Sequence, residues 1–193
     1  METGGAIYKG QDEETGELAN MKFRKADAGD IPVIVEIYDR THVEEEAGNT
    51  TVGWKRGIYP TQKVAEDSVA RGDMYVAETE GKVVATGIIN QEQVDVYADC
   101  DWKYKVPDDE VAVLHTLAVD PGAKGRGIGP GFVGYYEQLA KEWGCEVLRI
   151  DTNETNTAAR TMYKKLGYIE SGIVPTVFNG LKDINLVLLE KKL

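Results

Sequence analysis

The segment with the clearest chemistry is a glycine-rich turn, VDPGAKGRGIGPG, which runs from Val119 to Gly131. It follows an apolar run and opens a helical pattern, and the backbone N–H groups at such a helix start can hold an anion such as a phosphate. Glycines allow a ligand to approach closely, because they have no Cβ and tolerate positive φ. Lys124 and Arg126 add positive charge. The turn therefore predicts an anion-binding site, and the alternative is a structural turn that binds nothing.

Two nucleotide-binding patterns come close to this turn. The P-loop pattern G-x-x-x-x-G-K-[ST] fails, because Ile128 and Gly129 stand where the Lys and the Ser or Thr belong. The dinucleotide fingerprint G-x-G-x-x-G is present at Gly129, Gly131 and Gly134, and Asp151 ends the next apolar run. That fingerprint belongs directly at a strand end, whereas here about ten residues intervene. A chance match inside a helix is the better interpretation, and an NAD(P)-binding oxidoreductase stays the less favoured alternative.

The turn resembles the signature Q/R-x-x-G-x-G/A of the GNAT superfamily of acetyl-CoA-dependent N-acetyltransferases, which lies between that family's fourth strand and third helix. The matching residues are Lys124, Gly125, Arg126, Gly127, Ile128 and Gly129, and the typical run before them includes Leu117, Ala118 and Val119. Lys124 departs from the Gln or Arg of the family. This departure matters little if backbone amides do most of the pyrophosphate binding.

A second element lies downstream, where residues 156–168 read NTAARTMYKKLGY. It resembles the family's N-x-x-A-x-x-x-Y-x-x-x-G-[FY] element. Asn156 and Tyr163 are seven residues apart, which places them two turns apart on one helix face. The resemblance covers residues 21 to about 190 in the order of elements, with the specific motifs confined to residues 111–168.

The resemblance implies acetyl-CoA as cosubstrate and direct attack by an amine, without a covalent intermediate or a metal. It also implies that the pantetheine arm lies along the backbone of Leu117–Val119, where the Leu117 N–H would polarise the thioester carbonyl. Tyr163 becomes the candidate general acid, because a phenol is protonated at neutral pH and can donate to the departing sulfur. By its residue type alone, Tyr163 would be a core-packing tyrosine. Asn156 binds the cofactor, caps its own helix, or does both.

The general base stays open among three candidates. Family members often carry a Glu four residues before the position of Leu117, and here that position is Val113. His115 lies two residues further along the same strand face and is neutral enough near pH 7 to accept a proton. A lone His in such a strand is as often a structural residue. Glu110, at the strand entrance, and bulk water are the other candidates.

The acceptor is expected at residues 41–60, which contain the acids Glu44–Glu46 together with Trp54 and Tyr59. The acidic stretch 93–109 would border this segment. Aromatic rings beside acids would suit a cationic amine, and a solvated acidic face with one buried Trp is an equally good interpretation. Both a small-molecule amine and a peptide amine fit as acceptors.

The composition limits the classes of protein to consider. The 193 residues include 33 Asp and Glu against 22 Lys and Arg, a formal net charge of −11. This acidity argues against nucleic acid or an anionic membrane as partner, since both need a surplus of Lys and Arg. The apolar runs fall short of the ~18 residues of a membrane helix, and the N-terminus has no secretory pattern. Cys100 and Cys145 lack metal-type spacing, so we expect a reduced, cytoplasmic protein without metal. The sequence does not decide whether the protein forms a homodimer.

The elements that must position these residues alternate along the chain. We expect strands over residues 21–26, 74–79, 82–91, 111–119, 146–151, 168–174 and 185–190. We expect helices over residues 27–40, 61–71, 128–143 and 156–166, and a long loop over 93–109. This pattern predicts one α+β domain over residues 21–193 with a central mixed sheet, after a flexible N-terminal extension over residues 1–20. The resemblance adds a mostly antiparallel sheet of about six to seven strands, about four flanking helices, and splayed fourth and fifth strands.

A rival to the enzyme is a GNAT-like module that binds or senses acyl-CoA without turnover. The missing Glu at Val113 keeps this rival open, and the pair of Asn156 and Tyr163 argues against it.

Overall fold

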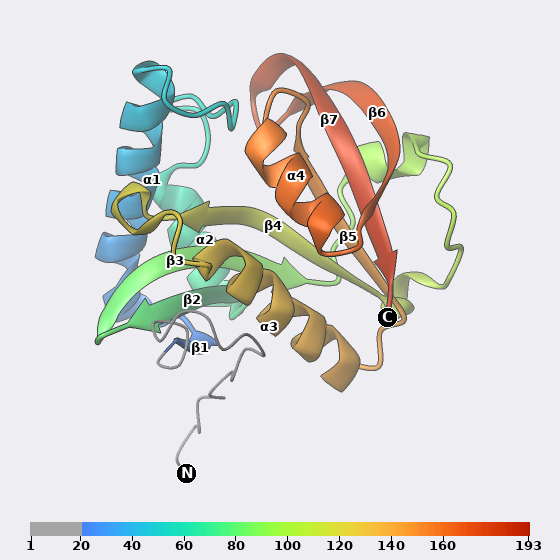
Figure 1. The fold of residues 1–193 in the computed structure, drawn as a ribbon, viewed down its shortest axis with the longest axis horizontal. Helices are drawn as coiled ribbons and strands as arrows, with labels where there is room; N and C mark the ends of the chain where they lie inside the picture. Colours follow the sequence, from blue (N-terminus) through green and yellow to red (C-terminus); the bar gives the residue numbers. More distant parts are fainter. Residues whose placement is uncertain (1–20) are drawn as a thin grey trace.

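One seven-stranded sheet organises the fold, with its strands in the order β1-β2-β3-β4-β5-β7-β6 (Figure 1). The computed structural model describes residues 21–193, so the extension predicted for residues 1–20 lies outside the described residues. The strands are β1 (Lys22–Lys25), β2 (Met74–Thr79), β3 (Lys82–Asn90), β4 (Val111–Val119), β5 (Val147–Asn153), β6 (Ile169–Phe178) and β7 (Leu181–Lys192). Only β4 and β5 pair in parallel. The predicted mixed, mostly antiparallel sheet is confirmed.

Four helices cover the two faces of this sheet, as predicted. They are α1 (Ile31–Glu46), α2 (Gln62–Arg71), α3 (Ile128–Glu142) and α4 (Thr157–Lys165). Alternate residues of β2 show which helices lie on which face, because successive side chains of a strand point to opposite sides. Tyr75 and Ala77 pack in one cluster with α3 and α4, whereas Met74 and Val76 pack in another with α1 and α2. Figure 1 shows α3 and α4 together in front of the sheet.

The segment 93–109 was predicted to be a loop, but it buries part of itself against the sheet. Tyr97 and Trp102 of this segment are 2% and 7% exposed, and they pack in a cluster with Val113 of β4 and residues of β7. The buried carboxylate of Glu190 accepts hydrogen bonds from two backbone N–H groups of the segment, at 2.7 and 3.1 Å. The segment therefore covers a sheet face that the helices leave open.

Helix α1 runs six residues beyond its predicted end at Arg40, to Glu46. The extension follows the apolar stripe of the helix: Thr41 and His42 continue it and are 5% and 3% exposed. Thr41 Oγ1 donates to the Ile37 carbonyl at 2.9 Å, and His42 Nε2 lies 3.0 Å from the Tyr59 carbonyl oxygen, whereas His42 Nδ1 is buried without a hydrogen-bond partner. The predicted end at Arg40 therefore falls just before two buried polar residues of the helix.

Strands β6 and β7 are also longer than predicted, because a tight hairpin joins them at Asn179-Gly180. These two residues have φ of 50° and 82°, as a type I′ turn requires. The dipeptide is a known hairpin signal that the prediction missed.

The predicted splay between β4 and β5 is confirmed by their register. Their pairing begins at Val111↔Val147 and ends at Leu114↔Ile150. Beyond this point β4 continues along β3, and β5 continues along β7 to Asn153. Each strand keeps its outer neighbour while the two separate from each other, which opens the sheet at its centre.

Within the described residues, no helix has both the length and the apolar character needed to cross a membrane.

Candidate active site

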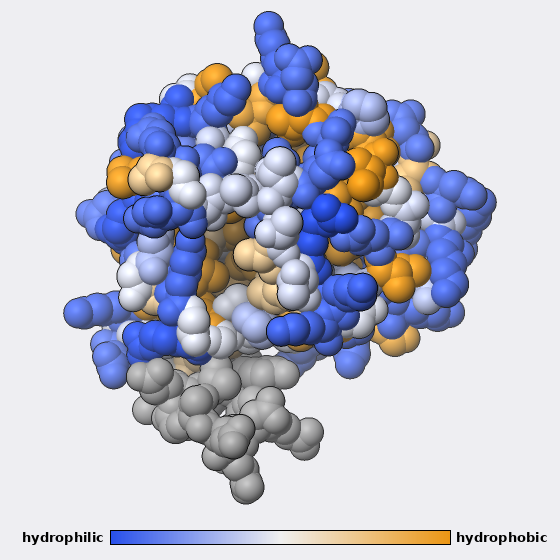
Figure 2. All heavy atoms as spheres, turned by 45° about the horizontal axis from the view of Figure 1, so that its top comes forward, coloured by the Kyte–Doolittle hydropathy of each residue, from blue (hydrophilic) through white to orange (hydrophobic). Residues whose placement is uncertain are grey.

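A cavity of about 850 Å³ opens where β4 and β5 part. Figure 2, in which the top of Figure 1 has come forward, shows a hollow with an apolar floor between largely hydrophilic rims. Its lining includes the site residues predicted from the sequence, with the exception of Arg126: His115, Leu117, Ala118, Val119, Lys124, Gly125, Gly127, Ile128, Gly129, Asn156 and Tyr163. The fold thus brings two separate sequence motifs to one cavity.

The glycine-rich turn forms one end of the cavity. Asp120 fixes its start, because its carboxylate accepts from the Gly122 N–H at 3.0 Å and from Arg40 of α1 at 2.8 Å. Gly125 and Gly127 have φ of 81° and 74°, and Gly127 is the N-cap of α3. Both glycines therefore adopt the left-handed conformation that favours glycine. The positive φ expected of these glycines is confirmed, and the start of α3 lies at the cavity.

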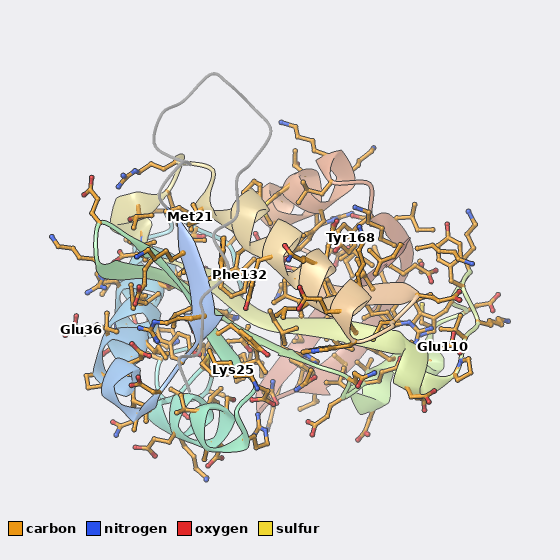
Figure 3. All side chains as sticks on the ribbon, turned by 90° about the horizontal axis from the view of Figure 1, so that it is seen from below. Met21, Lys25, Glu36, Glu110, Phe132 and Tyr168 are labelled. Carbon is orange, nitrogen blue, oxygen red and sulfur yellow. The ribbon has the colours of Figure 1, made fainter. Side chains whose placement is uncertain are left out.

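The glycines of the alternative dinucleotide fingerprint lie inside α3 and have different roles. A Cβ on Gly129 would meet Met162 Sδ at 3.0 Å, and a Cβ on Gly131 would meet Met21 Sδ at 3.3 Å. Gly131 therefore lets α3 approach β1, which Figure 3 shows beside Phe132 and Met21. Packing explains Gly131, and all three glycines lie inside α3, whereas a dinucleotide fingerprint belongs at a strand end.

Strand β4 is irregular at the point where it borders the splay. Its register with β3 shifts so that Thr116 and Leu117 have no matched partners, as in a β-bulge. Thr116 has a φ of 52°, a conformation that is rare and strained for a β-branched residue. Thr116 Oγ1 shares a hydrogen bond with the Tyr59 hydroxyl. The bulge takes Leu117 out of the regular pairing at the cavity, and on β3 the register shift falls at Gly87.

Tyr163 lies in α4 and is 4% exposed, with its ring 5.8 Å from that of Tyr168. Burial raises the pKa of its phenol well above the ordinary value of 10.0, and the nearby charge of Asp151 raises it further. Tyr163 is therefore both a packed core residue and a protonated donor that lines the cavity. The two interpretations of the sequence are compatible.

Asn156 is the N-cap of α4, which is one of the two roles predicted for it. Its Oδ1 accepts from the Ala159 N–H at 3.2 Å, and its Nδ2 donates to Thr152 Oγ1 at 3.1 Å. Asn156 also lines the cavity, so its role toward a cofactor stays a prediction.

His115 is held at the splay by acceptors on one side of its ring. Its Nε2 lies 3.2 Å from Asn90 Oδ1 and 3.1 Å from the Glu92 carbonyl oxygen. The Asn90 amide is oriented by the Glu92 N–H and by Asp73, so its oxygen faces His115. Because both partners are hydrogen-bond acceptors, Nε2 must carry the proton. Nδ1 is then left with the lone pair. Burial lowers the pKa of His115 below its ordinary 6.5, while the Asp151 charge opposes this shift.

Asp151 is a second titratable group at the splay. It directly follows Ile150, the last residue of β5 that pairs with β4, just as His115 follows Leu114. Burial raises the pKa of Asp151, whereas His115 and a hydrogen bond from Tyr97 lower it. The Tyr97 hydroxyl donates to Asp151 Oδ2 at 2.8 Å. The sequence showed Asp151 as a polar residue that ends an apolar run, but it did not indicate this partner from the segment 93–109.

Glu110, the predicted alternative base, lies outside the cavity lining. It occupies the far end of β4, where its carbonyl accepts from the Glu146 N–H at 2.9 Å (Figure 3). Four residues separate it from His115, and a strand advances about 3.3 Å per residue. Glu110 is therefore excluded as the base.

The acids Glu44–Glu46 do not line the cavity either. Glu45 accepts from the N–H groups of Val52 and Gly53 at 2.8 and 3.0 Å, and Glu46 pairs with Arg56 at 2.9 Å. These acids shape the segment that follows α1. The aromatic residues of this segment, Trp54 and Tyr59, do line the cavity, so the acids and the rings expected together at the acceptor lie apart.

Among residues 21–193, no group of three or more His, Cys, Asp or Glu side chains is placed to hold a metal ion.

Comparison with known structures supports the fold. An acetyltransferase of the GNAT family from Streptococcus agalactiae superposes with a TM-score of 0.75 at 22% identity, over 90% of this chain and 95% of that one. An acetyltransferase from Salmonella typhimurium, whose structure contains acetyl-CoA, gives a TM-score of 0.63 at 20% identity, over 89% and 93% of the two chains.

The sequence comparisons agree with this fold. The family model described as the acetyltransferase (GNAT) family matches residues 34–168. An uncharacterized N-acetyltransferase of Methanocaldococcus jannaschii is 32% identical over 110 residues, which are 57% of this chain and 45% of that protein. The matched part covers less than two thirds of the length of the curated relatives.

Proposed function

The chain belongs to the acetyltransferase (GNAT) family, and we propose that it transfers the acetyl group of acetyl-CoA to the amino group of an acceptor by direct attack. One observation carries the proposal: a single cavity runs from the glycine-rich turn to the opened strands, and His115 and Tyr163 line it.

The residues of the cavity fit acetyl-CoA. Gly125 faces open space, since a Cβ placed there would meet no atom within 4 Å. The positive φ of Gly125 and Gly127 and the start of α3 suit a pyrophosphate. Lys124 and Lys165 add two exposed cations at this end of the cavity. Lys165 was not predicted, and it would join Lys124 in attracting phosphate groups.

Acetyl-CoA supplies a thioester, whose carbonyl a neutral amine can attack. The Leu117 N–H, outside the regular ladder, would donate to the carbonyl oxygen as negative charge develops there. His115 would take a proton from the incoming ammonium group at Nδ1, because its low pKa keeps the ring neutral at pH 7. Tyr163 would give its phenolic proton to the departing sulfur.

The protons balance over one cycle. The N–C bond forms as the C–S bond breaks, and CoA leaves as a thiol with the proton of Tyr163. The acetylated nitrogen then loses its extra proton, which restores Tyr163. The proton that His115 received goes to solvent. The reaction therefore consumes one ammonium group and one thioester and yields an amide, a thiol and one proton.

Two measurements on the whole chain test this proposal: the binding of acetyl-CoA and NAD, and the turnover of acetyl-CoA with an amine. We expect calorimetry to detect binding of acetyl-CoA and no binding of NAD, and a thiol reagent to detect CoA release that depends on an added amine. Binding of NAD without acetyl-CoA would refute the proposal. Binding of acetyl-CoA without amine-dependent release across a broad amine panel would favour the sensing module.

A further inference from the structure

The end of the cavity opposite the turn has an aromatic wall, which we define as Trp54, Tyr59 and Phe178. The ring of Tyr59 contacts the other two edge to face, with centroids 6.2 Å apart for Trp54 and Tyr59 and 6.3 Å apart for Tyr59 and Phe178. They come from two distant parts of the sequence, the segment after α1 and the end of β6. All three line the cavity.

The charges around the cavity are distributed unevenly. Within residues 21–193, its charged lining consists of Lys124, Lys165 and Asp151. Both lysines belong to the end with the turn and α4. No Lys or Arg of the described chain lines the part formed by the aromatic wall and β7. An acceptor that carries a carboxylate or phosphate would bury that group there without a cationic partner, which is strongly unfavourable.

Asp151 is the one acidic group at this end of the described cavity. No Lys or Arg of residues 21–193 forms an ion pair with it, and its carboxylate accepts a hydrogen bond from the Tyr97 hydroxyl at 2.8 Å. Tyr97 is itself fixed, because its carbonyl accepts from Trp102 Nε1 at 2.8 Å and its ring lies 5.2 Å from that of Trp102. The segment 93–109 therefore holds a carboxylate at the splay and leaves it without a cation.

We propose that the acceptor is a primary amine with an uncharged, apolar body, whose ammonium group is bound by Asp151 and whose body lies against Trp54, Tyr59 and Phe178. Tyr97 is then a positioning residue for Asp151. This inference rests on the acetyl transfer proposed above and specifies its substrate class. The aromatic rings give the apolar body a surface against which to bury itself, while the carboxylate pairs with the ammonium group, so the two features bind different ends of the ligand.

The first test compares matched amines with the unaltered protein. Phenethylamine and L-phenylalanine share the amine and the ring and differ by one carboxylate, while ethanolamine and phosphoethanolamine differ by one phosphate. We expect kcat/KM to be at least about tenfold higher for phenethylamine than for phenylalanine, because the carboxylate would lie unpaired. Ethanolamine should exceed phosphoethanolamine in the same way, and phenethylamine should exceed ethanolamine.

The second test changes the carboxylate and its support. Asp151→Asn should raise KM for phenethylamine at least about tenfold and leave acetyl-CoA affinity unchanged, while Asp99→Asn, an exposed control on the same segment, should change neither. Tyr97→Phe should raise the pKa of Asp151, so that KM begins to rise at a higher pH as the solution is acidified. Tyr104→Phe removes a hydroxyl from the same segment without altering the contact with Asp151, and it should leave this pH profile in place.

The outcomes separate this inference from the proposed function. If acetyl-CoA does not bind, the proposed function fails. If acetyl-CoA binds but carboxylate- or phosphate-bearing amines are preferred, or alkyl and aryl amines are not acetylated, the inference alone is overturned. An unchanged KM in Asp151→Asn would remove Asp151 from the acceptor site.

Discussion

The two ends of the cavity are built in different ways. The turn end uses backbone groups of consecutive residues, with Gly125 and Gly127 in left-handed conformations and α3 starting directly after them. The splay end uses side chains from distant segments, among them Tyr97, His115 and Tyr163. A backbone site is local and tolerates changes in side chains, whereas a side-chain site depends on the register of the whole sheet. Substitutions at the two ends should therefore fail in different ways.

The largest expected effect is at the splay end. Tyr163→Phe should lower kcat by about 100-fold or more, because it removes the proposed proton donor for the sulfur. Burial holds the pKa of Tyr163 high, so the wild-type phenol stays protonated across the neutral range. Acetyl-CoA affinity, measured by calorimetry, should stay close to the wild-type value. A variant with wild-type kcat would show that Tyr163 serves only in packing.

His115→Ala should lower kcat/KM at pH 7 by about 100-fold and change its pH dependence. If His115 is the base, wild-type activity should be present above its pKa, which burial holds below 6.5, and should be lost as the pH falls through that value. The variant should lack this acidic limb in a profile of kcat/KM against pH. If the acidic limb of the profile kept its shape in the variant, His115 would not be the base, and bulk water would remain as the candidate.

A smaller effect, on affinity alone, is expected at the turn end. Gly125→Ala places a side chain at a φ of 81°, which costs about 1–2 kcal/mol and should weaken acetyl-CoA binding about tenfold. Gly144→Ala is the matched control, because Gly144 has a φ of 79° and similarly open surroundings but lies outside the cavity. Equal losses of affinity in both variants would mean that global stability, and not the turn, explains the result.

The smallest effect concerns the exposed lysines. Lys124→Ala and Lys165→Ala should each weaken acetyl-CoA binding a few-fold at low ionic strength, and the difference should fade in salt because exposed charges are screened. Lys164→Ala is the control, since Lys164 is exposed beside Lys165 but does not line the cavity. An equal, salt-sensitive loss in the Lys164 variant would indicate a general charge effect.

The sequence predicted most of the elements because their signals are local. The strand at Val111–Val119 and the glycine that ends α2 were found at the expected places. The errors have physical causes that are equally specific. The true end of α1 is hard to read from the sequence, because Thr41 and His42 are polar and yet buried. The Asn179-Gly180 hairpin was missed although its two residues are a strong turn signal.

The sequence by itself determined the turn, because contiguous residues specify a backbone conformation, and it determined that Tyr163 and Asn156 share a helix face. Only the tertiary structure decided that Glu110 lies remote from the cavity and that Asp151 lies beside His115 at the splay. It also decided that Tyr97 reaches Asp151 from the segment 93–109 and that Thr116 adopts a left-handed conformation. These features depend on where two strands stop pairing and on which loop covers the exposed face. Both are set by packing across the whole sheet and leave no pattern among neighbouring residues.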